Sequence, residues 1–123
     1  MTLKKLKDIA LDILLFLLIG VTALMLGSKI IYGKASIFGY RPFIVQSESM
    51  LPDYEVGTIL IAQVTDDVEI GEVYAYKNAI GMTIVHRLVD ITDEGYIFKG
   101  DNNDFTDNPV PLEKIQYKII HSY

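Results

Sequence analysis

The sequence of 123 residues contains no cysteine and only two histidines. The absence of cysteine excludes disulfide bonds, a thiolate nucleophile and thiolate zinc sites, and it leaves the redox compartment open. Positive charge is also limited, since the net charge is −5 and the basic residues are scattered. We therefore expect no nucleic-acid partner, because nucleic acids select concentrated basic surfaces.

Long apolar runs are absent except for one near the N-terminus. Residues 9–26 read IALDILLFLLIGVTALML, with Asp12 as the only charge. This length is close to the roughly 20 apolar residues that span a bilayer as a helix. Asp12 lies near the helix end, where a carboxylate can reach the membrane interface. The rest of the chain is long enough for one small domain, because a compact core usually needs on the order of 100 residues.

The charges around this run favour one orientation in the membrane. Three lysines precede the run, namely Lys4, Lys5 and Lys7. Such a cluster favours the cytoplasmic side. We therefore expect a cytoplasmic N-terminus over residues 1–8, a transmembrane helix in contact with membrane lipid over 9–31, and an extracytoplasmic domain over 32–123.

A cleavable secretory signal is the alternative interpretation of the N-terminal segment. In that interpretation Gly33 and Ala35 are the small residues at positions minus three and minus one before Ser36. The apolar run exceeds the roughly 7–15 residues usual for such signals, which favours the transmembrane helix. The remainder of the chain faces outward in either case.

After the apolar run the pattern changes to short segments rich in β-branched and aromatic residues. These segments predict strands at residues 43–46, 58–64, 72–76, 82–91 and 96–99. The segments 77–81 and 92–95 are typical of hairpin turns. The sequence predicts no further helix of useful length, so we expect a mainly β fold: an N-terminal transmembrane helix followed by a small, mostly antiparallel β domain.

Two serines alternate where the first predicted strand leads into a proline-bearing turn. Ser47 and Ser49 lie in the segment SESMLP, residues 47–52. In an extended chain they share one face, so that the hydroxyl of one and the backbone N–H of the other can face a developing oxyanion. For so short a motif taken alone, an ordinary serine-rich turn is the more frequent explanation.

A serine nucleophile needs a base within hydrogen-bond distance, and there are two candidates. His121 lies close to the C-terminus, where chains tend to fray, and is the weaker one. His86 lies in a predicted strand, on the same face as Ile84 and Leu88. Apolar neighbours hold an imidazole in place and favour its neutral form. A hydrogen-bonded core histidine without catalytic function is the alternative.

The segment 99–107 supplies carboxylates that can orient such a base, namely Asp101, Asp104 and Asp107. The alternatives are an acidic surface loop and a calcium loop. Against calcium, Phe105 stands where an EF-hand-like loop needs an oxygen ligand, and Thr106 replaces the turn glycine.

These segments together resemble the type I signal peptidases, in the branch found in the endoplasmic reticulum, archaea and some Gram-positive bacteria. The resemblance rests on three segments in this order: SESMLP at 47–52, IVHR at 84–87 and GDNN at 100–103. It implies Ser49 as nucleophile, His86 as general base and Asp107 as the carboxylate that orients it, with Asp101 as a second supporting carboxylate. The spacing leaves open whether the two aspartates are exchanged.

The resemblance also implies the remaining parts of the site. The Ser47 hydroxyl and the Ser49 N–H would form the oxyanion hole, no metal or cofactor is needed, and substrate would contact Gln46, Met50 and Pro52. The substrates would be signal-peptide-bearing preproteins with small residues at minus one and minus three. Many relatives continue beyond the position of Tyr123, which leaves open a minimal enzyme, a longer chain or a dependence on partner membrane subunits.

Three other interpretations stay open. Lys77, in a predicted turn, is the nearest lysine that could replace the histidine base, as in the common bacterial branch. A self-processing peptidase of the repressor-cleaving type shares a related β fold but usually pairs serine with lysine. A noncatalytic, membrane-tethered β module that binds an envelope or secreted partner is the alternative from outside the enzymes.

Overall fold

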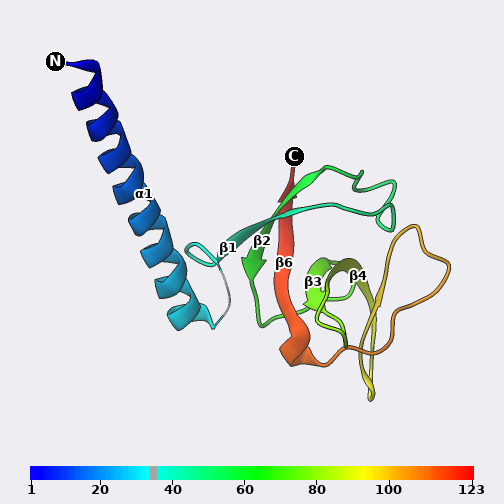
Figure 1. Ribbon diagram of the computed structural model, residues 1–123. Coiled ribbons are helices and arrows are strands. Elements are labelled where there is room, and N and C mark those ends of the chain that lie inside the picture. Colours follow the sequence, from blue (N-terminus) through cyan, green and yellow to red (C-terminus); the bar gives the residue numbers. More distant parts are fainter. Residues whose placement is uncertain (34–35) are drawn as a thin grey trace. The chain divides into compact units, whose positions relative to one another are not determined.

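A computed structural model of the chain describes residues 1–33 and 36–123 (Figure 1). The chain divides into two compact units, Met1–Gly39 and Tyr40–Tyr123. Ala35, which the secretory-signal interpretation places at the minus-one position, lies outside the described residues. That interpretation therefore stays a prediction.

The first unit contains the helix α1, Leu3–Tyr32. The helix begins after Thr2, whose hydroxyl accepts a hydrogen bond from the Lys5 amide at 3.2 Å and so caps the first turn. It ends at Gly33, whose φ of 69° is the left-handed conformation common at helix C-termini. The helix is long and apolar enough to cross a membrane. It starts before residue 9, so the N-terminal lysines belong to its first turns.

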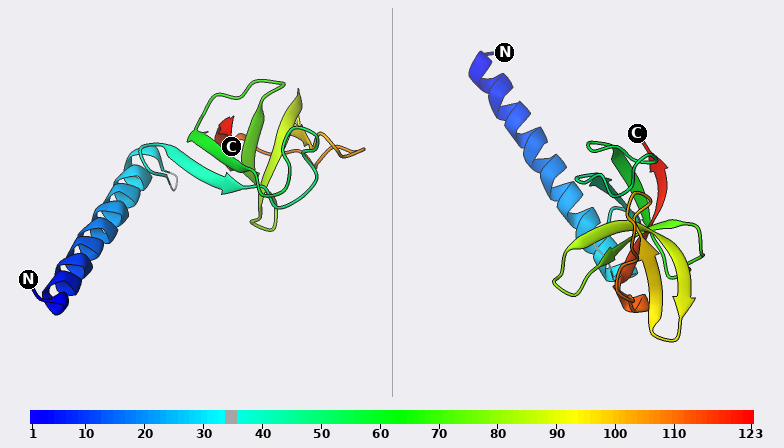
Figure 2. Two further views of the ribbon diagram at one scale, coloured as in Figure 1. Left: turned by 90° about the horizontal axis from the view of Figure 1, so that it is seen from above. Right: turned by 90° about the vertical axis from the view of Figure 1, so that its right-hand side faces the viewer.

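The second unit is an antiparallel sheet, which confirms the predicted mainly β fold with an N-terminal helix. In the described part of the chain the sheet has six strands in the order β1-β2-β6-β3-β4-β5, and each neighbouring pair is antiparallel. Their bounds are β1 Tyr40–Ile44, β2 Ile59–Val64, β3 Val73–Lys77, β4 Thr83–Thr92, β5 Gly95–Lys99 and β6 Ile115–Ser122. Figure 2 shows that the strands twist strongly about one another rather than forming a flat layer.

The strand β6 was not predicted, and it is central. It lies between β2 and β3 (Figure 1). Its residues Ile115, Tyr117 and Ile119 alternate and are buried, so the strand period was present in the sequence. The expectation that the C-terminus frays was wrong for His121, which pairs with Ile61 of β2.

Two further corrections concern element bounds next to the site. The predicted strand 43–46 is shifted, since β1 ends at Ile44 and residues 45–58 are not a strand. Lys77, expected in a turn, is instead the last residue of β3. The turn that follows is held by Asn78, whose side-chain oxygen accepts hydrogen bonds from two backbone amides at 3.1 and 2.9 Å.

The core consists of two apolar clusters, and β3 contributes to both because successive strand residues point to opposite faces. The first cluster contains Met50, Leu60, Ala62, Val73, Ala75, Tyr117 and Ile119. The second contains Tyr74, Tyr76, Leu88, Phe98, Val110 and Ile115. The strand β3 is thus buried on both faces. It is the rigid element against which β4 and its histidine are fixed.

Candidate active site

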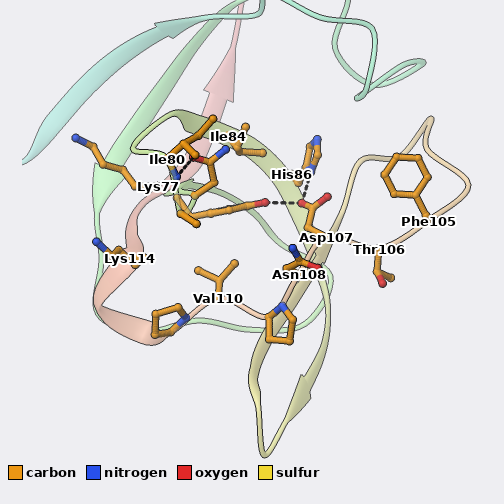
Figure 3. Close-up of a pocket in the computed structure, with 15 residues that line it drawn as sticks. Lys77, Ile80, Ile84, His86, Phe105, Thr106, Asp107, Asn108, Val110 and Lys114 are labelled. Atoms are coloured by element: carbon orange, nitrogen blue, oxygen red, sulfur yellow. Dashed lines mark hydrogen bonds and ion pairs between the residues drawn. The ribbon is translucent and has the colours of Figure 1, made fainter.

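Three side chains from separate parts of the second unit form a hydrogen-bonded chain. The Ser49 Oγ lies 3.1 Å from His86 Nε2, and His86 Nδ1 lies 2.5 Å from Asp107 Oδ2. Figure 3 shows the contact between the last two residues. Because an ionised carboxylate only accepts hydrogen bonds, the His86 Nδ1–H donates a hydrogen bond to Asp107, and the unprotonated Nε2 can accept one from the Ser49 hydroxyl. This is the arrangement that activates a serine.

Each member of this chain is positioned by the fold. His86 lies on β4 and is 8% exposed, on the face that carries Leu88 of the second core cluster. Ser49 lies in the turn that follows β1, and its neighbour Met50 is buried in the first cluster. The segment that carries Ser49 is therefore fixed to the first cluster, and the strand that carries His86 is fixed to the second.

The loop after β5 holds the Ser49 segment from the other side. The Asn102 amide donates a hydrogen bond to the Ser49 carbonyl at 2.8 Å, and the Asn102 side chain donates one to the Glu48 carbonyl at 3.1 Å. Gly100 of the same loop passes so close that a Cβ there would lie 2.7 Å from the Ser49 carbonyl oxygen and 3.0 Å from His86 Nε2. Glycine is needed here for close approach.

A second donor reaches the carboxylate of Asp107. The Tyr76 hydroxyl donates a hydrogen bond to Asp107 Oδ2 at 2.5 Å. Burial alone would raise the pKa of Asp107, but the hydrogen bonds from His86 and Tyr76 outweigh it and lower this pKa below its ordinary value. Burial, together with the hydrogen bond to Asp107, raises the pKa of Tyr76 far above its ordinary value. At neutral pH the carboxyl is therefore ionised and the phenol is protonated.

Asp101 does not contact His86 and instead binds Arg87, the residue that follows His86 in the sequence. The guanidinium donates hydrogen bonds to Asp101 at 3.0 and 2.9 Å, to Asp53 at 2.6 Å and to the Gly71 carbonyl at 2.6 Å. The hydrogen bond from Arg87 lowers the pKa of Asp101. This cluster ties the turn after Ser49 to the loop before Asn102.

Ser47 lies beside Ser49, with the two Oγ atoms 3.0 Å apart. Both serines lie in a turn and not in a strand, so the expected strand alternation does not explain their proximity. The turn brings the two hydroxyls together by itself. A carbonyl attacked by Ser49 would meet the Ser47 hydroxyl and the backbone of the same turn.

A cavity of about 560 Å³ opens at these serines. It is walled by residues 42–46 on one side and 82–86 on the other, and it includes Gln46, Ser47, Ser49 and Met50. Pro52 does not line this cavity, because it lies in the following turn, where a cis peptide bond joins it to Leu51. Of the three residues expected to contact substrate, Gln46 and Met50 thus lie at the cavity and Pro52 does not.

A second cavity, of about 710 Å³, also reaches the histidine (Figure 3). His86, Asp107 and Tyr76 line it, but Ser49 does not. This cavity is larger than the one at Ser49. The cavity at Ser49 is therefore the one that suits a substrate carbonyl.

The alternative bases lie elsewhere. Lys77 lines the second cavity and not the one at Ser49. The His121 ring packs edge-on against Tyr123 at 4.5 Å, on β6. Among residues 1–33 and 36–123, no group of three or more histidine, aspartate or glutamate side chains is arranged to hold a metal ion.

Three residues of this arrangement were missed from the sequence: Tyr76, Arg87 and Asp53. A local signal existed only for Arg87, which is part of the segment IVHR. Because it points to the opposite face from His86, the sequence pattern did not connect it to the site. Tyr76 and Asp53 reach the site through side-chain contacts with residues far away in the sequence, which no local pattern reveals.

Comparison with known proteins gives one similarity of note. No protein-family model matches the chain. The chain is 32% identical over 122 residues to signal peptidase I W of Bacillus subtilis (strain 168), in an alignment that covers 93% of this chain and 64% of that protein. The chain thus spans less than two thirds of the length of the relative that it matches.

Proposed function

We propose that this chain is a serine endopeptidase of the type I signal peptidase family, which is anchored in the membrane and removes N-terminal signal peptides from preproteins. The observation that carries the proposal is the hydrogen-bonded chain from Ser49 through His86 to Asp107. The similarity to a signal peptidase over nearly the whole of this chain supports the choice of substrate.

The proposed reaction is amide hydrolysis through an acyl-enzyme. Ser49 Oγ attacks the scissile carbonyl while His86 Nε2 accepts its proton, and the imidazolium then donates that proton to the leaving amine. The ionised Asp107 stabilises the imidazolium and fixes the tautomer. In the second half of the reaction, water attacks the ester and His86 again acts as base, which restores the serine.

The oxyanion would be stabilised from the serine turn. We assign this function to the Ser47 hydroxyl and the Ser49 backbone N–H, because hydroxyl and amide donors close to the nucleophile can point at the developing charge. The Ser47 Oγ at 3.0 Å from the nucleophile supports this assignment. A donor of this kind typically contributes about two to three orders of magnitude to kcat.

The cavity at Ser49 suits an extended peptide. It lies between residues 42–46 and 82–86, so that a substrate strand can run between two segments of the domain and use their backbone groups. We infer contacts to Gln46 and Met50. The small residues at minus one and minus three remain an expectation from the family resemblance.

The helix α1 would hold enzyme and substrate in one bilayer. We propose that residues 9–31 span the membrane with residues 1–8 in the cytoplasm and 32–123 outside, where signal-peptide junctions emerge. Confinement of both molecules to one membrane raises their effective concentration without new contacts. The exposed apolar surface of α1 supports contact with lipid.

The test is cleavage of signal-peptide-bearing preproteins by the detergent-solubilised chain, with the new N-terminus identified by mass spectrometry. We expect wild type and the control His121→Ala to cleave at the signal junction, and Ser49→Ala and His86→Ala to lose this activity. Cleavage that persists in Ser49→Ala would contradict the assigned nucleophile. A wild-type chain that binds but never cleaves several preproteins would favour the noncatalytic module.

A further inference from the structure

Two donors share one oxygen of Asp107. The Tyr76 hydroxyl and His86 Nδ1 each lie 2.5 Å from Asp107 Oδ2. The proposed reaction assigns functions to His86 and Asp107 but none to Tyr76. A buried phenol that competes with the base for the same carboxylate oxygen needs a physical explanation.

The tyrosine is more deeply buried than either of its partners. Tyr76 is 3% exposed, and its ring stacks on Phe98 with centroids 4.7 Å apart. It lies on β3, which is buried on both faces. Its hydroxyl therefore cannot follow the carboxylate if the loop that carries Asp107 moves, so the tyrosine fixes the carboxylate position.

The chemistry of the pair makes Tyr76 a permanent donor. Burial raises the pKa of the phenol far above its ordinary value, so its proton remains in place through the whole pH range in which a histidine titrates. A carboxylate that accepts an additional hydrogen bond has less negative charge to offer to its other partner. Imidazolium formation at His86 is then less favoured than it would be beside Asp107 alone.

We propose that Tyr76 is a positioning residue of this site: it holds the Asp107 carboxylate against His86 and weakens its charge, so that the imidazole stays neutral and available as a base at lower pH. The catalytic meaning of this inference rests on the proposed peptidase function. The effect on the imidazole does not, because it needs only the three side chains.

The other charged groups of this cavity and of the adjoining loop do not contact the pair. Lys77 of β3 and Lys114, just before β6, line the same cavity as His86 and Asp107 (Figure 3). Asp101 is bound to Arg87 instead. These groups are unchanged when only the hydroxyl of Tyr76 is removed.

The experiment is an NMR titration of the chain labelled in histidine, comparing wild type with Tyr76→Phe. With only two histidines in the sequence, each imidazole gives a resolved curve, and His121 serves as an internal reference. We expect the His86 midpoint to rise by about 0.5 to 1 pH unit in Tyr76→Phe, because one hydrogen bond to a charged partner is lost. The His121 midpoint should stay in place.

Tyr74→Phe is the matched control. Tyr74 lies on the same strand and face and also packs against Phe98, but its hydroxyl accepts a hydrogen bond from the Glu69 amide at 2.8 Å. The control loses the same atom and is expected to lose stability, yet its His86 midpoint should match wild type. A His86 midpoint that shifts equally in both variants, or falls in Tyr76→Phe, would overturn the inference.

Activity gives a second measurement. In preprotein cleavage, Tyr76→Phe should lower kcat by about fivefold and move the acidic limb of kcat/KM upward in step with the NMR midpoint. An unmoved acidic limb with lower activity would contradict the assigned function of Tyr76. If wild type cleaves no preprotein, the proposed function fails, whereas the titration still decides the inference about Tyr76.

Discussion

Replacement of Gly100 by alanine should separate the geometry of the site from the stability of the fold. The added Cβ would lie 2.7 Å from the Ser49 carbonyl oxygen and 3.0 Å from His86 Nε2, whereas ordinary contacts begin at 3.4 Å. The φ of Gly100 is not in the left-handed region, so the backbone itself accepts alanine. The effect is therefore steric, and it is directed at the Ser49 backbone, at the His86 ring and at the Asn103 side chain, whose Nδ2 would lie 2.7 Å from the added Cβ.

The magnitude follows from the displacement. The Ser49 carbonyl must retreat from 2.7 Å to about 3.4 Å, or the loop must retreat and weaken the 2.8 Å hydrogen bond from the Asn102 amide. A misplacement of about 1 Å near reacting groups can cost on the order of 100-fold in rate. We therefore expect kcat for preprotein cleavage to fall by roughly 10- to 100-fold. Overpacking of this kind destabilises a protein by about 1–3 kcal/mol.

Gly81→Ala is a suitable control for the loss of stability. Gly81 has a φ of 81° and open space around its Cβ position, so alanine there is strained by its backbone alone and touches nothing at the site. Both variants should unfold at lower temperature, measured by circular dichroism, but only Gly100→Ala should lose most of its kcat. Equal losses of activity in the two variants at equal loss of stability would refute the steric reasoning.

Two further predictions concern the carboxylates. In Arg87→Lys the side chain cannot reproduce the planar fork that binds both oxygens of Asp101. Because the pair is partly exposed, we expect urea unfolding to show a stability lower by about 0.5–1 kcal/mol. A loss of stability that does not shrink at high salt would contradict an ionic cause. The pKa of Asp107 is lowered in the folded chain, so the stability that its ionised form contributes is present above about pH 4 and is lost as the pH falls through the folded pKa. Asp107→Asn should therefore be less stable at neutral pH and lose less stability on acidification, in urea unfolding measured from pH 7 down to about pH 2; parallel curves for the two chains would count against this linkage.

The fold class could be predicted because its signals are local. The apolar run, the strand period and the hairpin turns each occupy a few consecutive residues, and the structure has a helix and an antiparallel sheet where they occur. The strand β6 was missed for a different reason. Its alternation is as clear as that of the other strands, but its place between β2 and β3 depends on pairings far apart in the chain.

The site residues also divide into those that a local sequence pattern reveals and those that only the folded structure reveals. Ser49, His86 and the two aspartates stand in short segments that can be recognised in the sequence. Tyr76 cannot be recognised so, because an aromatic residue in a buried strand is ordinary core. Its contact with Asp107 arises from the pairing of β3 with β4 and from the course of the loop after β5. Only the folded domain brings Tyr76, His86 and Asp107 together.

The question of which aspartate meets the histidine is decided by strand alternation and not by spacing. His86 and Arg87 are consecutive residues of β4, so they point to opposite faces. The loop after β5 sends Asp107 to the histidine and Asp101 to the arginine. The two carboxylates therefore act on different partners, and their loss should differ in kind: Asp107→Asn should alter the pH dependence of the base, whereas Asp101→Asn should loosen the Asn102 loop that holds Ser49 and lower kcat without moving that dependence.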